Sequence, residues 1–139
     1  MAYAALTDLV AMYGERELIA ATTEEGTPRT TVDADKVARA LTNASDLMDT
    51  YLLRRYATPV TPPTPTLVAT CCKIARVDLN STGATVPTDQ MLSDRKVAMG
   101  WLEAIAAGRA TLDGAVAANT SDSFSRIATR PAPYCQGRL

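Results

Sequence analysis

The chain has 139 residues, enough for one domain that buries roughly two thirds of its unfolded surface without help from metals or disulfides. Its 14 basic and 15 acidic residues nearly cancel, so the whole chain lacks the basic field that drives nonspecific nucleic-acid binding. Histidine is absent, which removes the commonest general base and metal ligand and makes most hydrolytic mechanisms hard to build.

The amino-terminal stretch from Met1 to Val10 lacks the basic and apolar regions of a secretory signal, and no apolar run approaches the ~20 residues that span a bilayer. We therefore expect a soluble protein made in the cytoplasm. Its three cysteines, two of them adjacent at Cys71 and Cys72, form neither a disulfide framework nor a zinc pattern. They are expected to be small apolar side chains, buried or half-exposed.

Two short helices and a loop are predicted first. Thr7 is placed to cap a helix that would stop at Gly14. A second short helix is predicted from Glu15 to Ala21, because its acidic first turn suits the positive end of the helix dipole. The segment TTEEGTPRTT, residues 22–31, has the composition of a loop. The apolar residues expected in the first helix are Leu9, Val10, Met12 and Tyr13.

A long helix follows, and Asp33 is a good N-cap for it. Apolar residues recur at intervals of three and four, which puts one stripe on a helix from about Asp33 to Tyr56, roughly 36 Å long. Four prolines in residues 59–65 are expected to stop this helix, because proline disfavours helical geometry in the residue before it and lacks an amide hydrogen.

Two further helices are predicted after the prolines. Thr64 and Pro65 form a cap and first-turn pair for a helix that reaches Leu79, after which residues 80–87 are a loop. Pro87 or Thr88 opens the last helix, and Gly108 ends it. Its apolar set is expected to be Met91, Leu92, Ala98, Trp101, Leu102 and Ile105. Gly100 inside this helix costs about 1 kcal/mol relative to alanine, so it is either tolerated or marks a closely packed backbone.

The last segment, residues 109–139, has no sustained period and carries four arginines against two aspartates. Sparse apolar residues on a basic strip are typical of a segment that orders against a partner, and a frayed tail is the alternative. We predict an all-α fold: a small bundle of about four to five helices in residues 1–108, with an extended, mostly irregular carboxy-terminal tail in 109–139. The core is expected to contain Leu41, Met48, Tyr51, Leu52, Ile74, Trp101, Leu102 and Ile105.

The carboxylate pairs do not point to catalysis. Asp46 and Asp49 share one side of a helix, but without histidine or a glycine-rich phosphate loop they are interpreted as solvated surface. We therefore expect no enzyme, no cofactor and no metal site. A small helical DNA-binding or regulatory module remains the alternative to an assembly protein, although no trusted helix-turn-helix spacing supports it.

Four blocks, in order, resemble one known family. They are DLVAMYGERELI at 8–19, ALTNASDLMDTYLLRRYATPV at 40–60, CCKIARVDL at 71–79 and WLEAIAAGRATL at 101–112. They are similar to the opening, the central signature and the third and fourth helices of the Mu-like phage head-to-tail joining proteins, small neck proteins of tailed phages and prophages. Beyond residue 112 the resemblance is confined to FSR at 124–126.

The resemblance implies a structural protein of the virion neck, between capsid and tail. Such an adaptor forms a homo-oligomeric ring, commonly twelvefold, beneath the portal protein and offers a surface to a stopper or tail-completion protein. Double-stranded DNA passes through the lumen without sequence recognition, and no membrane is involved. In the family pattern Arg55 recurs, so we expect it to pair with a carboxylate or helix-end carbonyls, and Arg54 to be a solvated or intersubunit charge.

Two sets of residues are the candidate contacts of such an adaptor. Loops on a rigid bundle commonly carry binding, so residues 22–31, and with them residues 80–87, are predicted to face the next neck protein. The contact residues in the first loop are Glu24, Glu25, Thr27 and Arg29. The predicted contacts with the portal or a neighbouring subunit lie in the tail, at Phe124, Arg126, Ile127, Arg130 and Tyr134.

Overall fold

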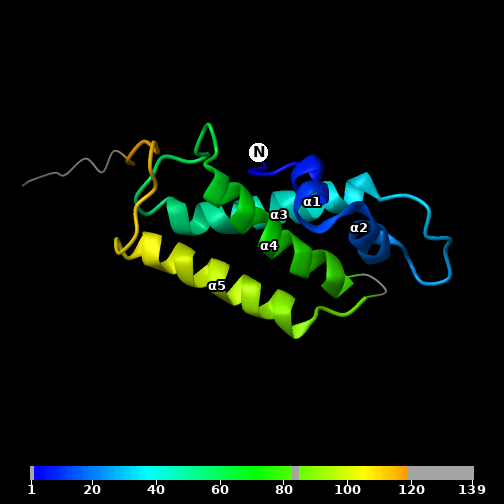
Figure 1. Cartoon of the computed structure of the whole chain (residues 1–139). Coiled ribbons are helices and arrows are strands. Elements are labelled where there is room, and N and C mark those ends of the chain that lie inside the picture. The colour runs from blue at the N-terminus through cyan, green and yellow to red at the C-terminus, as the bar shows by residue number, and fades with distance from the viewer. Residues whose placement is uncertain (1, 83–84, 119–139) are drawn as a thin grey trace, which may run out of the picture.

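The structure, a computed structural model, describes residues 2–82 and 85–118. Over these ranges it is all-α, as predicted, with an isolated bridge between Tyr56 and Ala117. Figure 1 shows α3, α4 and α5 side by side as the body of the molecule, with α1 and α2 against α3 and α4. The helices are α1 (Leu6–Tyr13), α2 (Glu15–Thr22), α3 (Ala34–Leu52), α4 (Pro65–Thr82) and α5 (Asp89–Ala106).

Three of the predicted helix starts are confirmed by side-chain caps. The Asp33 carboxylate accepts hydrogen bonds from the N–H groups of Asp35 and Lys36 at 3.0 and 3.1 Å. The Thr64 hydroxyl accepts from Leu67 at the start of α4, and the Thr88 hydroxyl accepts from Met91 at the start of α5. These bonds satisfy amides that have no partner within the helix, so each start is a local property of the sequence.

The predicted start of α1 is wrong. The helix begins at Leu6 with Ala5 as its N-cap residue, and Thr7 lies inside the first turn. The Asp8 carboxylate accepts from the Ala5 N–H at 2.8 Å, so the third helical residue reaches back to the chain entering the helix. The stop at Gly14 is confirmed, since its φ of 87° lies where side chains are disfavoured.

The predicted end of α3 is also wrong. The helix ends at Leu52, four residues before Tyr56, so the prolines stand beyond a turn and do not themselves stop it. After a turn in which the Arg55 and Tyr56 N–H groups donate to the Leu52 carbonyl, the backbone pairs with a distant segment. The Ala57 N–H donates to the Val116 carbonyl, and the Ala118 N–H donates to the Arg55 carbonyl, each at 2.9 Å.

The segment that forms these bonds is residues 110–118, which we call the strap. It follows α5 without helix or named strand and runs beside the proline connection between α3 and α4, where Figure 1 draws it in orange. Leu112 in the strap is buried in the core, and its N–H donates to the Tyr56 hydroxyl at 2.9 Å. The described part of the predicted tail is thus irregular but lies against the helices.

The α4 helix extends three residues beyond the predicted Leu79, to Thr82. Asn80 is buried there, and its side-chain amide donates to the Arg76 carbonyl at 2.8 Å. The polar composition of residues 80–82 suggested a loop, but the hydroxyls of Ser81 and Thr82 bond back to carbonyls one turn earlier. Such bonds let serine and threonine remain in a helix.

All five helices contribute to one hydrophobic core. Most residues expected there have at most 3% of their surface exposed, namely Leu41, Met48, Leu52, Ile74, Leu102 and Ile105. Tyr51 and Trp101 are half-buried and pack against this core from its edge. Met12 and Leu92, which were expected on apolar faces, are instead 43% and 48% exposed. Met91 takes the inward position on the first turn of α5 that Leu92 was predicted to share.

Gly100 has open space around it. A Cβ added at this position would meet nothing within 4 Å, so no described backbone packs closely there. Of the two explanations for this glycine, only tolerance of its cost fits the single chain. No helix of the described residues combines the length and the apolar character needed to cross a membrane.

Candidate functional site

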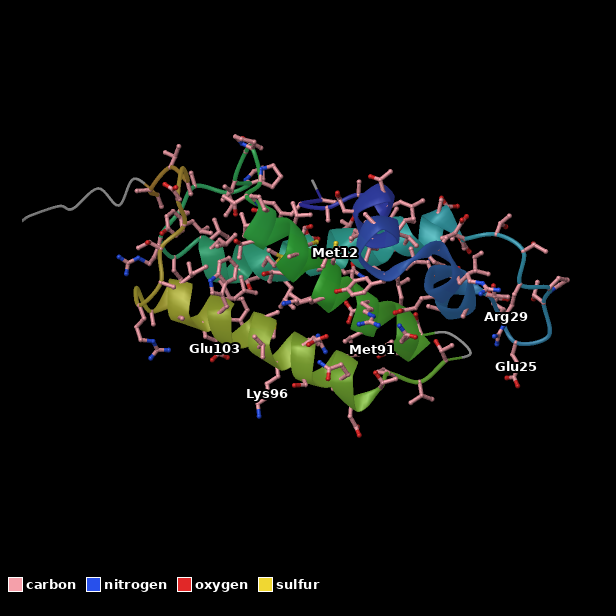
Figure 2. All side chains as sticks on the ribbon, in the orientation of Figure 1. Met12, Glu25, Arg29, Met91, Lys96 and Glu103 are labelled. Carbon is pink, nitrogen blue, oxygen red and sulfur yellow. The ribbon has the colours of Figure 1, made fainter. Side chains whose placement is uncertain are left out.

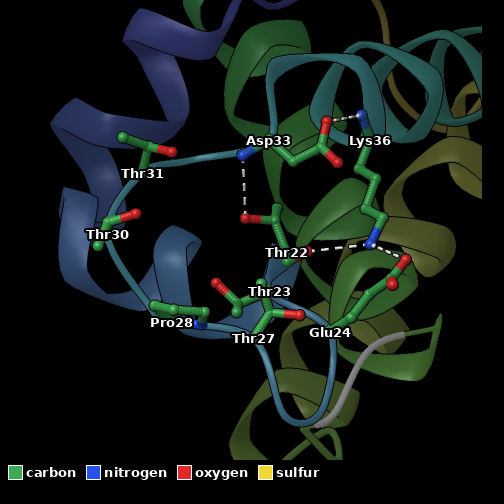
Figure 3. A pocket seen from close by; sticks show the side chains of 9 residues that line it. All are labelled: Thr22, Thr23, Glu24, Thr27, Pro28, Thr30, Thr31, Asp33 and Lys36. Atoms are coloured by element: carbon green, nitrogen blue, oxygen red, sulfur yellow. Dashed lines mark hydrogen bonds and ion pairs between the residues drawn. The ribbon is translucent and has the colours of Figure 1, made fainter.

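The loop between α2 and α3 is held closed at its base. Thr22, the last residue of α2, is buried, and its hydroxyl accepts from the Asp33 N–H at 3.2 Å. From the first turn of α3, the Lys36 ammonium donates to the Thr22 carbonyl and to the Glu24 carboxylate, both at 3.1 Å. Figure 3 shows these bonds joining the two ends of the loop. The base is therefore fixed although most of the loop is exposed.

A polar hollow of about 450 Å³ lies inside this loop (Figure 3). Threonine hydroxyls dominate its lining, and Lys36 is the one cation among the lining residues. The residues that line it are Thr22, Thr23, Glu24, Thr27, Pro28, Thr30, Thr31, Asp33 and Lys36. The Lys36 charge is already paired with Glu24, so the hollow offers hydroxyls and carboxylates rather than a free charge for a ligand.

Two of the predicted contact residues stand outside this hollow. Glu25 and Arg29 are both exposed on the loop (labelled in Figure 2), and neither is among the residues that line the hollow. Glu24 and Thr27 line the hollow instead. The structure therefore brings the four predicted loop residues together on one projection, with opposite charges at its tip.

The predicted tail contacts Phe124, Arg126, Ile127, Arg130 and Tyr134 lie outside the described residues. What the structure does describe is the point from which the tail departs. The Ala118 N–H donates to the Arg55 carbonyl just beyond the end of α3, so Ala118, the last described residue, lies at the end of the molecule opposite the α2–α3 loop (Figure 1).

The side chains considered for catalysis are occupied in structural contacts. Asp49, interpreted as solvated, is half-buried and accepts a hydrogen bond from the Tyr3 hydroxyl, so that interpretation is wrong for Asp49; Asp46 is exposed. Cys71 and Cys72 are buried, and burial raises the pKa of the Cys72 thiol to about 12. A thiol with so high a pKa is protonated at neutral pH and is a poor nucleophile. Among residues 2–82 and 85–118, no cluster of acidic residues and cysteines could hold a metal ion.

Arg54 and Arg55 are both exposed at the end of α3. The Arg55 guanidinium lies directly over Gly108, at the end of α5, where it fills the space that a side chain would need. Arg55 was expected to pair with a carboxylate or with helix-end carbonyls. No ion pair and no side-chain hydrogen bond of Arg55 is found among the described residues, where its guanidinium lies beside Gly108 and the alanines of the strap.

Residues 3–128 match the family described as bacteriophage Mu Gp36. The chain belongs to this family. It is 32% identical over 112 residues to "Gene product J" of Escherichia phage Mu, covering 78% of the chain and 74% of that protein. It is also 37% identical over 81 residues to the Mu-like prophage FluMu protein gp36 of Haemophilus influenzae, covering 58% of the chain and 55% of that relative. The relationship to Mu-like phage proteins expected from the four sequence blocks is confirmed at the level of the family.

Two features of this Gp36-family protein were missed by sequence reasoning. Tyr3 is buried and joins α3 to the proline connection, although nothing in the first five residues signals a buried side chain. Arg76 links three helices: it donates to Glu17 of α2, lies 4.2 Å from the ring centroid of Tyr13 and approaches Asp94 of α5 at 4.0 Å. An arginine inside a predicted apolar helix was the available signal for this cluster.

Proposed function

We propose that this protein is a head-to-tail adaptor of a tailed phage: a virion neck protein that forms a ring beneath the portal and joins the DNA-filled capsid to the stopper or tail. The observation that carries the proposal is the family match over residues 3–128, together with the relative in phage Mu. A small helical protein without a catalytic constellation in its described residues agrees with a role in assembly.

The arrangement of the two candidate surfaces supports this role. The α2–α3 loop and the start of the tail lie at opposite ends of the elongated bundle (Figure 1). A protein that connects two partners needs two separate contact surfaces on a rigid body. Here the loop base holds the loop, and the strap holds Ala118, from which the tail follows. In this proposal the loop meets the next neck protein, and the tail meets the portal or a neighbouring subunit.

Electron microscopy of the protein mixed with its portal tests the proposal. A ring of copies coaxial with the portal is the expected result. Monomers or dimers that bind duplex DNA in a salt-dependent manner, without any ring on the portal, would instead support the DNA-binding or regulatory alternative.

The role of the tail is tested by truncation after Ala118, which keeps the buried Leu112 and the bonds of the strap. The shortened protein is expected to remain folded but to lose joining activity in an assay that combines portal-containing heads with tails. A matched full-length variant, Glu25→Ala with Arg29→Ala, changes only the tip of the opposite loop. This double variant should still bind the portal but should no longer bind the next neck protein. If the truncated protein still completes infectious particles, the tail is not the contact with the portal or a neighbouring subunit.

A further inference from the structure

The end of the bundle where α3, α5 and the strap meet carries a second hollow. Its volume is about 350 Å³, and it is lined by Arg54, Arg55, Ala106, Ala117 and Ala118. Both arginines are exposed, and no carboxylate is among the lining residues. The hollow therefore joins two guanidinium groups to a small, smooth surface of alanines.

The position of Arg55 depends on Gly108. A Cβ at residue 108 would collide with the Arg55 guanidinium, and the φ of +80° at this glycine already disfavours any other residue. The guanidinium thus lies against the end of α5 in a defined place. The planar guanidinium offers a rigid fork of donors, which suits the oxygens of a phosphate or carboxylate group.

The positive charge of this hollow is not neutralised within the described chain. The ion pairs of the described residues involve Lys36, Arg76 and Arg95, and none involves Arg54 or Arg55. The carboxyl ends of α3 and α5 each contribute about half a negative elementary charge, which does not offset two full positive charges. Arg109, one residue beyond Gly108, and Asp113 in the strap are both exposed, and their charges cancel, so the two arginines of the hollow remain the excess positive charge.

More positive charge is tethered to the same place. Residues 119–139 follow directly from Ala118, which lines the hollow, and they contain three arginines and one aspartate. A single carboxylate could pair with the guanidinium groups of the hollow but would not reach the arginines of residues 119–139. A ligand that could also meet the tethered cations must carry negative charge over a distance, as duplex DNA does with one charge per ~1.7 Å of its axis.

We infer that the hollow formed by Arg54 and Arg55 is a contact site for the phosphodiester backbone of duplex DNA. The inference rests on the proposed adaptor function, in which DNA passes through the ring. Apart from the two guanidinium groups, the lining side chains are alanine methyl groups, which cannot read base edges by hydrogen bonding. The contact is therefore independent of sequence and has the strength of a few phosphate contacts.

The test measures binding of the full-length protein to fluorescein-labelled duplexes of two unrelated sequences by fluorescence anisotropy, across a range of potassium chloride concentrations. Equal affinity for both duplexes is expected. The double variant Arg54→Ala/Arg55→Ala should lower the slope of log K against log salt by about 2, because each phosphate contact contributes about 0.9. Arg54→Ala alone, which leaves the Arg55 contact with Gly108 intact, should lower it by about 1.

A matched control removes the same charge elsewhere. Arg16→Ala/Lys96→Ala changes two exposed cations on α2 and α5 and should leave the slope within about 0.5 of the wild type. Equal slopes for both double variants, or no loss of slope in Arg54→Ala, would overturn the inference. So would a hollow variant that binds DNA normally but no longer binds the portal, since the site would then receive an acidic protein surface. A coaxial ring seen alongside any of these results would leave the adaptor proposal standing.

Discussion

Tyr3 is the residue that most directly joins segments distant in the chain. Its N–H donates to the Ser45 hydroxyl at 2.9 Å, its own hydroxyl donates to the Asp49 carboxylate, and that hydroxyl accepts from the Val60 N–H at 3.2 Å. The side chain is only 4% exposed. One residue of the amino-terminal stretch thus holds the proline connection against α3.

Tyr3→Phe removes both bonds of the hydroxyl while preserving the ring. The Val60 N–H and the Asp49 carboxylate then lose a partner in a partly buried site, so the free energy of unfolding should fall by about 1–3 kcal/mol. Urea unfolding at neutral pH measures this loss. Tyr51→Phe is the control, because no hydrogen bond of the Tyr51 hydroxyl is found within the described chain, and it should change stability by less than about 0.5 kcal/mol. Equal losses in the two variants would show that the Tyr3 hydroxyl contributes nothing specific.

The same residue makes stability depend on pH at the alkaline end. Burial, together with the hydrogen bond to Asp49, raises the pKa of Tyr3 from 10.0 to about 12. The folded state therefore binds the phenolic proton more tightly than the unfolded state. The resulting stabilisation is complete below pH 10 and is lost as the pH rises toward 12. Wild type and Tyr3→Phe should thus differ more in unfolding free energy at pH 8 than at pH 11.5, and a constant difference would contradict the assignment.

At the scale of the helix, Gly100 in α5 is either a tolerated glycine or a site where another copy of the chain packs closely. Because nothing lies within 4 Å of the added Cβ, Gly100→Ala should stabilise the isolated protein by about 0.5–1 kcal/mol. Thermal unfolding measures the change. Greater stability with normal ring formation would mean that the glycine has no packing role. Greater stability with impaired ring formation would mean that another copy approaches α5 there.

The strap is held by one buried side chain and a few backbone bonds. Leu112→Ala should cost about 2–5 kcal/mol, since Leu112 is buried in the hydrophobic core. Val116→Ala in the same strap is the matched control, because Val116 is 72% exposed, and it should cost less than about 0.5 kcal/mol. Chemical denaturation of both variants checks the contrast. A small effect at Leu112 would mean that the strap contributes little to the fold.

The starts of α3, α4 and α5 could be predicted because caps act over three residues, as at Asp33, Thr64 and Thr88. The backbone pairing just beyond α3 could not, because its partners are residues 116–118, about sixty positions further along the chain. The strap has only two large apolar side chains, Leu112 and Val116, and only Leu112 is buried. One buried residue among alanines makes no periodic pattern from which its burial could be predicted.

The candidate sites divide in the same way. The α2–α3 loop was predictable, since glycine, proline and threonine determine it locally. The arginine hollow was not, because Arg54, Ala106 and Ala118 come from three separate segments and meet only in the fold. The sequence showed the arginine pair but gave no means of knowing that Gly108 would lie beneath Arg55.

For the whole molecule, the boundary between body and tail is measurable. A chain of residues 1–118 keeps Leu112 and the bonds from Ala57 and Ala118, whereas a chain of residues 1–111 loses all of them. The longer form should therefore exceed the shorter by at least about 2 kcal/mol in unfolding free energy. Calorimetry or urea titration of the two forms checks this. Equal stabilities would place the boundary at the end of α5 instead.

The bond between Ala118 and Arg55 also limits where a partner can be captured. Twenty-one residues follow Ala118, and a fully extended chain of that length spans at most about 75 Å. Any surface that residues 119–139 bind must lie within that radius of Ala118. Once the body has docked, binding by these residues becomes intramolecular, with an effective concentration that can reach the millimolar range. A weak tail contact can then suffice to hold a partner that the free tail peptide would barely bind.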